Sequence, residues 1–455
     1  MVVADEIPSF LLSGSEGAGE QSRRQHEGRR AILLTRESEV SEFVALTSTM
    51  GIEIVETILQ TGRSDPRSVI GSGRLEAVSD ELKAKVRGHP WTGVDLVLVH
   101  YNATPRQLVN LNDVLDVEVW DRVRLLLHLF TAHANSVEAA TQVRLARLRA
   151  DRSLLREMVR RETAGERLGW GAGGRHAWRG VLETVQKEVV SVQRRQKKHA
   201  ISQAERRRQR RRSGAMTVGL AGYTNAGKST LFCALSGKKV LIEDGLFSTL
   251  ETTVGRMVSS PRVLLADTIG FIDHVPADLL DAFRATLAES LECDLLLLVL
   301  DASDEVIEIK RKLETCRRDL LERLDTDKAP TIQVVLSKID IVEGTLEEVI
   351  SLVEDKGLTV IEHVSAQKRI GIEQLNDSIL THLFGEPYIL IIEGAKKTTD
   401  TPLERIVHDF YEMGHVDSQS QPSGGGTFIE IRMSHADLSR LMSRYPNRIE
   451  IQNRA

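Results

Sequence analysis

Apolar and polar positions follow two alternating periods along the first third of the chain. Four short apolar runs have the length of buried strands: 31–35, 52–57, 95–100 and 117–120. Helical spacing separates these runs at 39–50, 74–86 and 105–115. Strands that alternate with helices favour a parallel sheet covered by helices. We therefore expect an N-terminal parallel α/β domain over residues 29–132, preceded by a polar tail at 1–28 that we expect to be disordered.

The pattern changes between residues 133 and 213, where a narrow apolar stripe runs along otherwise charged helices. The stripe residues recur at three- and four-residue steps: Val143, Ala146, Ala150, Leu154 and Met158, then Val181, Val185, Val189 and Val192. This spacing predicts a long helical hairpin. Its tip, Gly165–Gly180, is rich in glycine and carries two tryptophans together with Arg175 and Arg179. The tip is either an RNA-binding loop, by base stacking and phosphate contact, or a flexible connection.

The second hairpin helix ends in a dense basic run. Six arginines fall within seven residues: Arg206, Arg207, Arg208, Arg210, Arg211 and Arg212. The whole chain has a net charge of −5, so the positive charge is concentrated here. Such a run is often a solvated helix face, but its density favours a polyanionic partner. Nucleic acid is the first interpretation, and a membrane surface is the second because no apolar face accompanies the basic one.

The stretch GYTNAGKST fits G-x-x-x-x-G-K-[ST], the phosphate-binding loop, and lies between an apolar strand and a helix start. Backbone N–H groups and the helix N-terminus would bind the phosphates. Lys228 would reach the β- and γ-phosphates, and the Ser229 hydroxyl would bind Mg²⁺. We expect nucleotide contacts along the whole loop: Gly222, Tyr223, Thr224, Asn225, Ala226, Gly227, Lys228, Ser229 and Thr230.

A second nucleotide element follows the apolar run 262–266. Asp267 opens the sequence DTIGF, where an acid at a strand end can support Mg²⁺, and the Gly270 amide would sense the γ-phosphate. Upstream, LFSTLETTVGR is expected to form a switch loop that the γ-phosphate orders. One of its three threonines should close on Mg²⁺: Thr249, Thr252 or Thr253.

The sequence SKID carries a guanine-recognition element. The Asp340 carboxylate can accept two hydrogen bonds from guanine N1 and N2, which selects GTP over ATP, and the Lys338 stem would lie along the base. Ser337 stands where Asn or Thr is usual, and we expect this exchange to loosen the coupling between the guanine loop and the phosphate loop. Further on, Ser365 and Ala366 would meet the base, with the Ala366 amide at guanine O6. These elements predict a P-loop GTPase domain over 214–385.

Two positions affect the expected reaction. Phe271 stands where many GTPases place a glutamine that orients the attacking water, so we expect slow hydrolysis that another group or a partner must complete. Asn225 is the residue type that some GTPases use to hold K⁺ against the phosphates in place of an arginine finger. Mg²⁺ is therefore the expected metal cofactor and K⁺ a hypothesis.

The last segment, 386–455, predicts a small α+β domain without a catalytic constellation. Strands are expected at 388–392 and 428–433, helices at 401–413 and 436–445, and a loose linker over Ser418–Gly426. No apolar run approaches the roughly 18 residues needed to span a bilayer. The acidic first 30 residues lack the apolar region of a signal peptide, so we expect a cytoplasmic protein. No long heptad array indicates an obligate dimer, and we expect a monomer.

The motifs together resemble the HflX family of the Obg–HflX group of P-loop GTPases. The resemblance rests on GYTNAGKSTL, LFSTLETT, DTIGFI and LLDAFRATLAES, and continues upstream in IGSGRLEAV, TPRQLVNLNDVL and DRVRLLLHLFTAHANSVEAATQVRLARL. It covers about residues 29–385. It implies a GTPase with Lys228, Thr249 and Gly270 in catalytic roles, and with Ser229, Thr249 and Asp267 at Mg²⁺. Thr249 is favoured over Thr253 as the switch threonine.

The resemblance also implies partners. Proteins of this family bind the large ribosomal subunit, contact rRNA through the hairpin loop, and dissociate or rescue ribosomes or support subunit maturation. The expected RNA-binding residues are Arg175, Arg179, Arg206, Arg207, Arg208, Arg210 and Arg211. The hairpin loop here reads GAGGRHAWRG, without the proline and the acidic end of the family's GGIGxRGPGE, so its contacts are expected to differ. The alternatives are a GTP-dependent regulatory switch or an RNA-remodelling protein acting off the ribosome.

Overall fold

The computed structural model describes most of the chain. The described residues are 11–12, 25–84, 88–134, 136–164, 177–212, 215–238, 253–267, 270–271, 292–321, 329–393, 401–421 and 426–454. The described residues form two compact units, and the boundary between them lies near residue 205. Among the described helices, none combines the length and the apolarity that crossing a bilayer requires.

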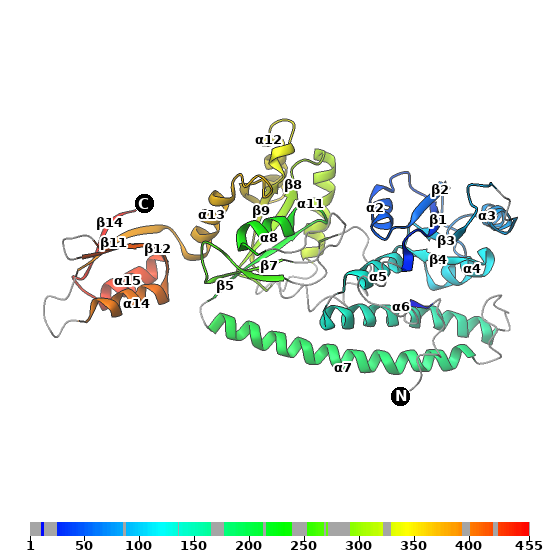
Figure 1. The fold of residues 1–455 in the computed structure, drawn as a ribbon, viewed down its shortest axis with the longest axis horizontal. Helices are drawn as coiled ribbons and strands as arrows, with labels where there is room; N and C mark the ends of the chain where they lie inside the picture. Colours follow the sequence, from blue (N-terminus) through cyan, green and yellow to red (C-terminus); the bar gives the residue numbers. More distant parts are fainter. Residues whose placement is uncertain are drawn as a thin grey trace. The chain divides into compact units, whose positions relative to one another are not determined.

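The first unit contains a four-stranded parallel sheet in the order β2-β1-β3-β4. Its strands are β1 (Arg30–Thr35), β2 (Glu53–Leu59), β3 (Val94–Val99) and β4 (Glu118–Asp121). Four helices accompany them: α2 (Ser41–Thr49), α3 (Ser72–Ala84), α4 (Pro105–Leu115) and α5 (Arg122–His133). Helices α2 and α5 lie on one side of the sheet and α3 and α4 on the other (Figure 1). The predicted parallel α/β domain is confirmed, and its two covered faces explain the unbroken apolar runs.

The predicted helical hairpin is confirmed as α6 (Val137–Thr163) and α7 (Ala177–Arg212). The Ser136 hydroxyl caps α6 by accepting a hydrogen bond from the Ala139 N–H. Buried residues of the apolar stripe on both helices, such as Leu154 and Val185, join the core of the α/β domain. The hairpin therefore packs onto this domain through the stripe that the sequence pattern predicts.

Three described residues of the predicted disordered tail are buried in this unit: Leu11, Leu12 and His26. Leu11 and Leu12 have almost no exposed surface, and Leu11 belongs to the shared core. The Leu12 N–H donates a hydrogen bond of 3.0 Å to Asp151 of α6, whose carboxylate also lies 3.5 Å from Arg124. The tail prediction is therefore wrong at these residues, because two leucines are too few to show a periodic pattern.

A cluster of rings fills the junction of β4 and α5. The Trp120 indole stacks on the His128 ring at 4.0 Å between centroids, and His26 meets both rings edge-on. Burial lowers the pKa of His26 to about 4 and that of His128 well below its usual value. Both imidazoles are therefore neutral near pH 7 and act as packing groups.

The second unit begins with a six-stranded sheet in the order β10-β9-β8-β5-β7-β6, in which β6 runs antiparallel to β7. Its strands are β5 (Met216–Gly222), β6 (Thr253–Arg256), β7 (Val263–Asp267), β8 (Leu295–Asp301), β9 (Thr331–Ser337) and β10 (Thr359–His363). The helices are α8 (Lys228–Ser236), α11 (Val306–Leu321), η3 (Ile339–Ile341), α12 (Glu347–Asp355) and α13 (Ile372–Phe384). Helix α8 packs with α13, and α11 packs with α12. Residues Leu295–Leu300 of β8 are all buried, as a strand covered on both faces requires.

The same unit ends in the predicted α+β domain, a four-stranded antiparallel sheet in the order β12-β13-β11-β14. Its elements are β11 (Pro387–Glu393), α14 (Leu403–Met413), β12 (His415–Ser420), β13 (Gly426–Arg432), α15 (His435–Arg444) and β14 (Ile449–Arg454). This is the split βαββαβ arrangement. The linker prediction is wrong for Ser418–Ser420, which belong to β12. Neither this strand nor β14 shows the full apolar alternation that would have predicted it.

Candidate functional site

The loop after β5 has a backbone that few residues other than glycine allow. Gly222 has a φ of +147°, and a Cβ atom there would lie 2.3 Å from the carbonyl oxygen of Val299 on β8. Asn225 and Gly227 also have positive φ angles, of 63° and 86°. Gly227 precedes the first residue of α8, so the loop leads directly into a helix N-terminus. This geometry turns backbone N–H groups and the positive helix end towards one point, as an anion site requires.

Lys228 lies at the start of α8 with its side chain buried. Its Nζ donates a hydrogen bond of 2.7 Å to the carbonyl oxygen of Tyr223. Burial lowers the pKa of this ammonium to about 8, and the nearby Asp267 carboxylate opposes the shift. A buried cation with one backbone acceptor can exchange that acceptor for a phosphate oxygen.

Asp267 and Ser229 supply hard oxygen donors next to this lysine. Asp267 ends β7 and is fully buried, while Ser229 is half-buried in the first turn of α8. A carboxylate and a hydroxyl of this kind fit Mg²⁺, which prefers oxygen ligands and keeps several waters. Thr249 and Thr252 lie outside the described residues. Thr253 begins β6 directly opposite Asp267 in the ladder.

Gly270 and Phe271 lie against the phosphate loop. A Cβ atom on Gly270 would come within 2.8 Å of Lys228 Nζ and of the Thr224 Cα, so only glycine fits there. The Phe271 N–H donates to the Gly222 carbonyl, and the Phe271 carbonyl accepts from the Thr224 N–H, both at 2.9 Å. The buried Phe271 therefore holds Gly270 close to Lys228, and it has no group that could orient a water.

The guanine loop is joined to the phosphate loop by Ser337. Its hydroxyl lies 2.7 Å from the carbonyl oxygen of Ala226 and 2.9 Å from that of Leu300. One hydroxyl proton serves one of these acceptors at a time. The shorter serine side chain therefore still reaches the phosphate loop, through one donor instead of the two that an asparagine amide would offer.

Lys338 follows with a left-handed backbone, at a φ of 58°, and its Nζ lies 2.6 Å from the Asp301 carboxylate at the end of β8. Asp340 is exposed in η3. Sequence reasoning missed Asp301, although an acid that ends an apolar strand is a recognisable signal. The pair fixes the Lys338 stem beside the position expected for the base.

The Ser365–Ala366 loop lies next to the guanine loop because β9 and β10 are neighbours. The Ile339 N–H donates to the Val364 carbonyl at 3.3 Å. Ser365 is buried, exchanges two backbone hydrogen bonds with Ile370, and accepts at its hydroxyl from the Lys368 N–H. Ala366 is half-buried beside it. The structure therefore brings the predicted guanine residues to one edge of the sheet.

Helix α11 supports the phosphate loop from its other side. The Arg311 and Lys312 cations lie 5.5 Å and 5.3 Å from the ring centre of Tyr223, and Lys312 pairs with Asp304 at 2.7 Å. A small cavity of about 60 Å³ is lined by Tyr223 and Lys312 together with Asn225 of the phosphate loop. Neither basic residue was singled out from the sequence, because nothing in a helical spacing shows which loop a helix supports.

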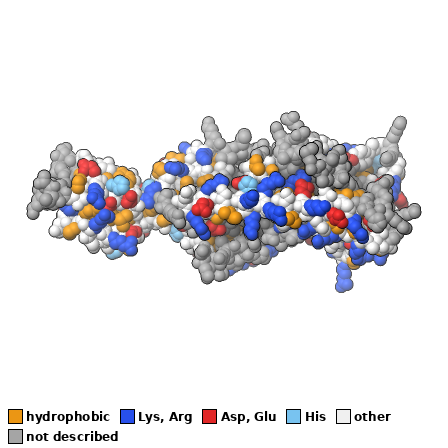
Figure 2. Space-filling view, turned by 90° about the horizontal axis from the view of Figure 1, so that it is seen from below, with side chains coloured by type: hydrophobic (Ala, Val, Ile, Leu, Met, Phe, Trp, Pro, Cys, Tyr) orange, Lys and Arg blue, Asp and Glu red, His pale blue; other side chains and the backbone are white. Residues whose placement is uncertain are grey.

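Basic side chains crowd helix α7, as Figure 2 shows on one face. Arg179, Arg206 and Arg208 are exposed, while Arg175 and the side chains of Arg207, Arg210 and Arg211 lie outside the described part. Four further exposed cations have no ion pair with any described residue: Arg194, Arg195, Lys197 and Lys198. The positive charge therefore extends well beyond the arginine run.

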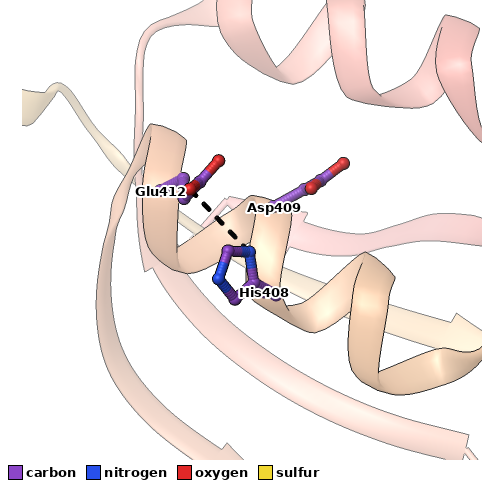
Figure 3. A group of neighbouring side chains, drawn as sticks. All are labelled: His408, Asp409 and Glu412. Carbon is purple, nitrogen blue, oxygen red and sulfur yellow. Dashed lines mark ion pairs between the residues drawn. The ribbon is translucent and has the colours of Figure 1, made fainter.

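A second group of possible metal ligands lies on α14, where the His408, Asp409 and Glu412 side chains come within 4.8 Å of one another. Figure 3 shows the ion pair of 4.0 Å between His408 and Glu412. The Asp409 carboxylate pairs with Arg444 at 2.7 Å and accepts a hydrogen bond from the Tyr445 hydroxyl. These ion pairs and this hydrogen bond account for the cluster, in which Asp409 is buried, and we assign no metal to it.

Comparison with known proteins gives consistent matches. Residues 217–338 match the family model described as 50S ribosome-binding GTPase, and residues 37–131 match that of a GTP-binding GTPase N-terminal domain. The chain is 32% identical over 445 residues to the GTPase HflX of Escherichia coli K12, which covers 95% of this chain and 98% of that protein. It is 36% identical over 334 residues to the GTPase HflX of Methanocaldococcus jannaschii, covering 72% and 79%. A GTP-binding protein of Sulfolobus solfataricus, solved with GDP, is similar at 23% identity and a TM-score of 0.44, over 78% of this chain and 98% of that chain.

Proposed function

Since the chain belongs to the HflX family of GTPases, we propose that it is a ribosome-associated factor whose GTP hydrolysis is stimulated by the large ribosomal subunit. It would dissociate or rescue ribosomes or aid the maturation of the subunit. The observation that carries this proposal is the concentration of positive charge along α7, with Arg179, Arg194, Arg195, Lys197, Lys198, Arg206 and Arg208 exposed, in a chain that also has a complete phosphate loop. We further propose that it acts in the cytoplasm as a monomer.

The proposed handling of GTP follows from the residues at the ends of the strands. Lys228 gives up the Tyr223 carbonyl and binds the β- and γ-phosphates, while the N–H groups of the loop bind the same oxygens. Asp340 accepts from guanine N1 and N2, and the Ala366 amide lies at O6. Ser229 and Asp267 would hold Mg²⁺, with Thr249 as the switch residue, and the ion supplies charge neutralisation at the phosphates when bound.

The hydrolysis step needs a group that this chain does not place at residue 271. Phe271 is buried and bonded through its backbone to Gly222 and Thr224, so it holds the Gly270 amide towards the γ-phosphate but cannot orient water. A partner that completes the site would raise the rate. This is the physical reason to expect stimulation by a ribosomal subunit rather than rapid hydrolysis by the chain alone.

The basic helix indicates the chemistry of that partner. A dense group of cations on one helix favours a polyanion, because binding to a nucleic acid releases its counterions. We propose that rRNA is bound by Arg179, by the arginine run, and by the four cations between Arg194 and Lys198. Arg175, which lies close to Arg179 in the sequence, would also contribute.

Asn225 supports a second cation. It is exposed at the phosphate loop with a left-handed backbone, so its amide oxygen is available to an ion beside the phosphates. We propose K⁺ in this role. Turnover in K⁺ should exceed turnover in Na⁺ for the unmodified chain and should be equal in both for Asn225→Ala. Equal rates for the unmodified chain would exclude the proposal.

The experiment that tests the main proposal is GTP turnover with and without purified large ribosomal subunits, together with subunit binding at rising salt. We expect strong stimulation and an affinity that falls steeply with salt. Reversing charge with Arg206→Glu and Arg208→Glu should weaken binding, while Lys310→Glu, an exposed lysine on α11, serves as the matched control. Intact GTP binding without stimulation would instead favour a switch that acts on another partner.

A further inference from the structure

The turn between β6 and β7 faces the small C-terminal domain within the second unit. Residues 257–262 form this turn, and it is held internally by the hydrogen bonds from Met257 to Val263 and from Val263 to Ser260. Strand β7 then runs from the turn to Asp267. Strands β6 and β7 form a hairpin around this turn. Strand β6 forms the end of the first predicted switch segment and β7 leads into the second, so a contact at the turn affects both segments.

Arg262 makes the main contact. Its guanidinium donates to the carbonyl oxygens of Tyr411 at 2.8 Å and Gly414 at 2.7 Å through one nitrogen, and to that of Glu412 at 3.1 Å through the other. These acceptors lie at the C-terminal end of α14, where carbonyl groups lack partners within the helix. A cation there also interacts favourably with the helix dipole. Arg262 therefore caps a helix of the neighbouring domain.

Ser260 and His415 make a second, buried contact at the same junction. The Ser260 hydroxyl, fully buried, lies 3.1 Å from His415 Nδ1, and His415 Nε2 lies 3.4 Å from the Asp417 carboxylate. The His415 ring stacks on Phe384 at 5.5 Å, and the Arg262 guanidinium lies 6.0 Å from the same Phe384 ring. The junction therefore consists of directional bonds around a shared aromatic ring, which fixes both position and orientation.

Strand β7 connects the Arg262 contact at the turn to Asp267 at the nucleotide site. The Arg262 carbonyl accepts from the Met216 N–H at 3.0 Å, and β7 then pairs with β5 residue by residue up to Asp267. On its other side β7 pairs with β6, the edge strand, where Thr253 lies opposite Asp267. The edge strand has no further neighbour in the sheet. The hairpin is also held by α8, whose Leu235 carbonyl accepts from the Val258 N–H, and by Asn376 on α13, which bonds Ser259. The C-terminal domain is therefore one of several supports of this hairpin.

From these contacts we infer that Arg262 is a positioning residue for GTP hydrolysis, through which the C-terminal domain sets the place of Asp267. The inference rests on the proposed role of Asp267 at Mg²⁺. The C-terminal domain is then a control element of the active site rather than a passive appendage. A macromolecule that moves α14 would change the position of β7 and with it the rate of hydrolysis.

The test uses full-length variants on both sides of the junction. Arg262→Leu removes the three hydrogen bonds to α14, and His415→Ala removes the contact with Ser260 from the other domain. We expect both to lower kcat by about tenfold, as a small misplacement of a catalytic group does. Bound Mg²⁺ slows the release of a fluorescent GDP analogue. Both variants should therefore need a higher Mg²⁺ concentration than the unmodified chain to reach the same slow release. Affinity for that analogue without Mg²⁺ should stay unchanged, since the phosphate and guanine loops are untouched.

Controls separate this effect from lost folding. Arg440→Leu removes an exposed arginine from α15 and should leave kcat and the Mg²⁺ dependence unchanged, while Arg262→Lys should restore part of the loss. If Arg262→Leu and His415→Ala lower only the melting temperature, the inference is overturned. Asp267→Asn tests the proposed function separately: if it leaves hydrolysis and Mg²⁺ dependence intact, the assignment of Asp267 fails. If Asp267→Asn impairs hydrolysis while Arg262→Leu leaves it unchanged, the role of Arg262 is rejected and the proposed role of Asp267 stands.

Discussion

The Ser337 hydroxyl oxygen lies 2.7 Å from the carbonyl oxygen of Ala226, so the guanine loop is tied to the phosphate loop by one short hydrogen bond. The same hydroxyl lies 2.9 Å from the Leu300 carbonyl oxygen. An asparagine amide could donate to two acceptors at once, whereas serine has one proton for both. The coupling is therefore present in this chain, but it depends on a single donor.

Removing that donor should speed the release of nucleotide. Ser337→Ala leaves the Ala226 carbonyl without this partner, and a hydrogen bond of this kind contributes about 1 kcal/mol, or roughly fivefold in a rate. We expect GDP to dissociate faster by about that factor, measured by displacement of a fluorescent analogue. Ser443→Ala removes a hydroxyl bonded within α15 and is the control. An unchanged rate for Ser337→Ala would show that the bond does not link the two loops.

Gly270 should tolerate no side chain. The Cβ atom of Gly270→Ala would lie 2.8 Å from Lys228 Nζ and from the Thr224 backbone, so the loop must move away from the γ-phosphate position. We expect hydrolysis to fall by at least about tenfold, while GDP still binds through the guanine loop. Gly73→Ala is the matched control, because no atom lies within 4 Å of its Cβ position. Full activity of Gly270→Ala would contradict the described closeness of these loops.

Nucleotide binding should be linked to protonation of Lys228. The pKa of this ammonium is about 8 without nucleotide, and bound phosphates favour its charged form, so binding raises the pKa. At pH 9 we expect GTP binding to take up protons and to be weaker than at pH 7. Calorimetry in two buffers with different ionisation enthalpies measures this uptake. Binding at pH 9 with no proton uptake would contradict the lowered pKa.

The same shift affects folding in a defined pH window. The pKa of Lys228 in the folded protein, about 8, lies below the ordinary value of 10.5. Between these values the unfolded chain binds more protons, so the contribution of Lys228 to the free energy of unfolding rises with pH from about 8 to 10.5. Denaturant titrations of the nucleotide-free protein should show this rise, and Lys228→Met should reduce it. An identical pH profile for both chains would rule it out.

Asp151 should be a stabilising residue of the first unit. Its buried carboxylate accepts the Leu12 N–H and lies 3.5 Å from Arg124, so Asp151→Ala would leave the arginine buried without this charge. Breaking such a pair by removing one partner lowers the free energy of unfolding by about 3 kcal/mol. Chemical denaturation monitors the loss. Asp80→Ala, at an exposed position on α3, is expected to have little effect. A near-neutral Asp151→Ala would mean that the tail contact is not needed.

The sequence predicted those parts of the fold in which local pattern and tertiary environment agree. Unbroken apolar runs such as Leu295–Leu300 identify a strand covered on both faces, and the glycines of the phosphate loop identify a backbone that only they adopt. Strand β12 was missed because HVDSQS is polar and exposed, and its pairing with β13 depends on a neighbour far along the chain. The partners of Arg262 were likewise unpredictable, since they are backbone carbonyls about 150 residues away.

The stacked Trp120 and the rest of the tryptophans have a practical consequence for spectroscopy. All four tryptophans of the chain, Trp91, Trp120, Trp170 and Trp178, precede residue 205 and thus belong to the first unit. The nucleotide domain and the small C-terminal domain contain no tryptophan, so tryptophan fluorescence reports on the first unit. Tryptophan emission during denaturation, excited at a wavelength that tyrosine does not absorb, therefore follows the first unit, while the signal of a bound fluorescent nucleotide follows the second. The two together would show, in one cuvette, whether the halves of the molecule melt in one transition or in two.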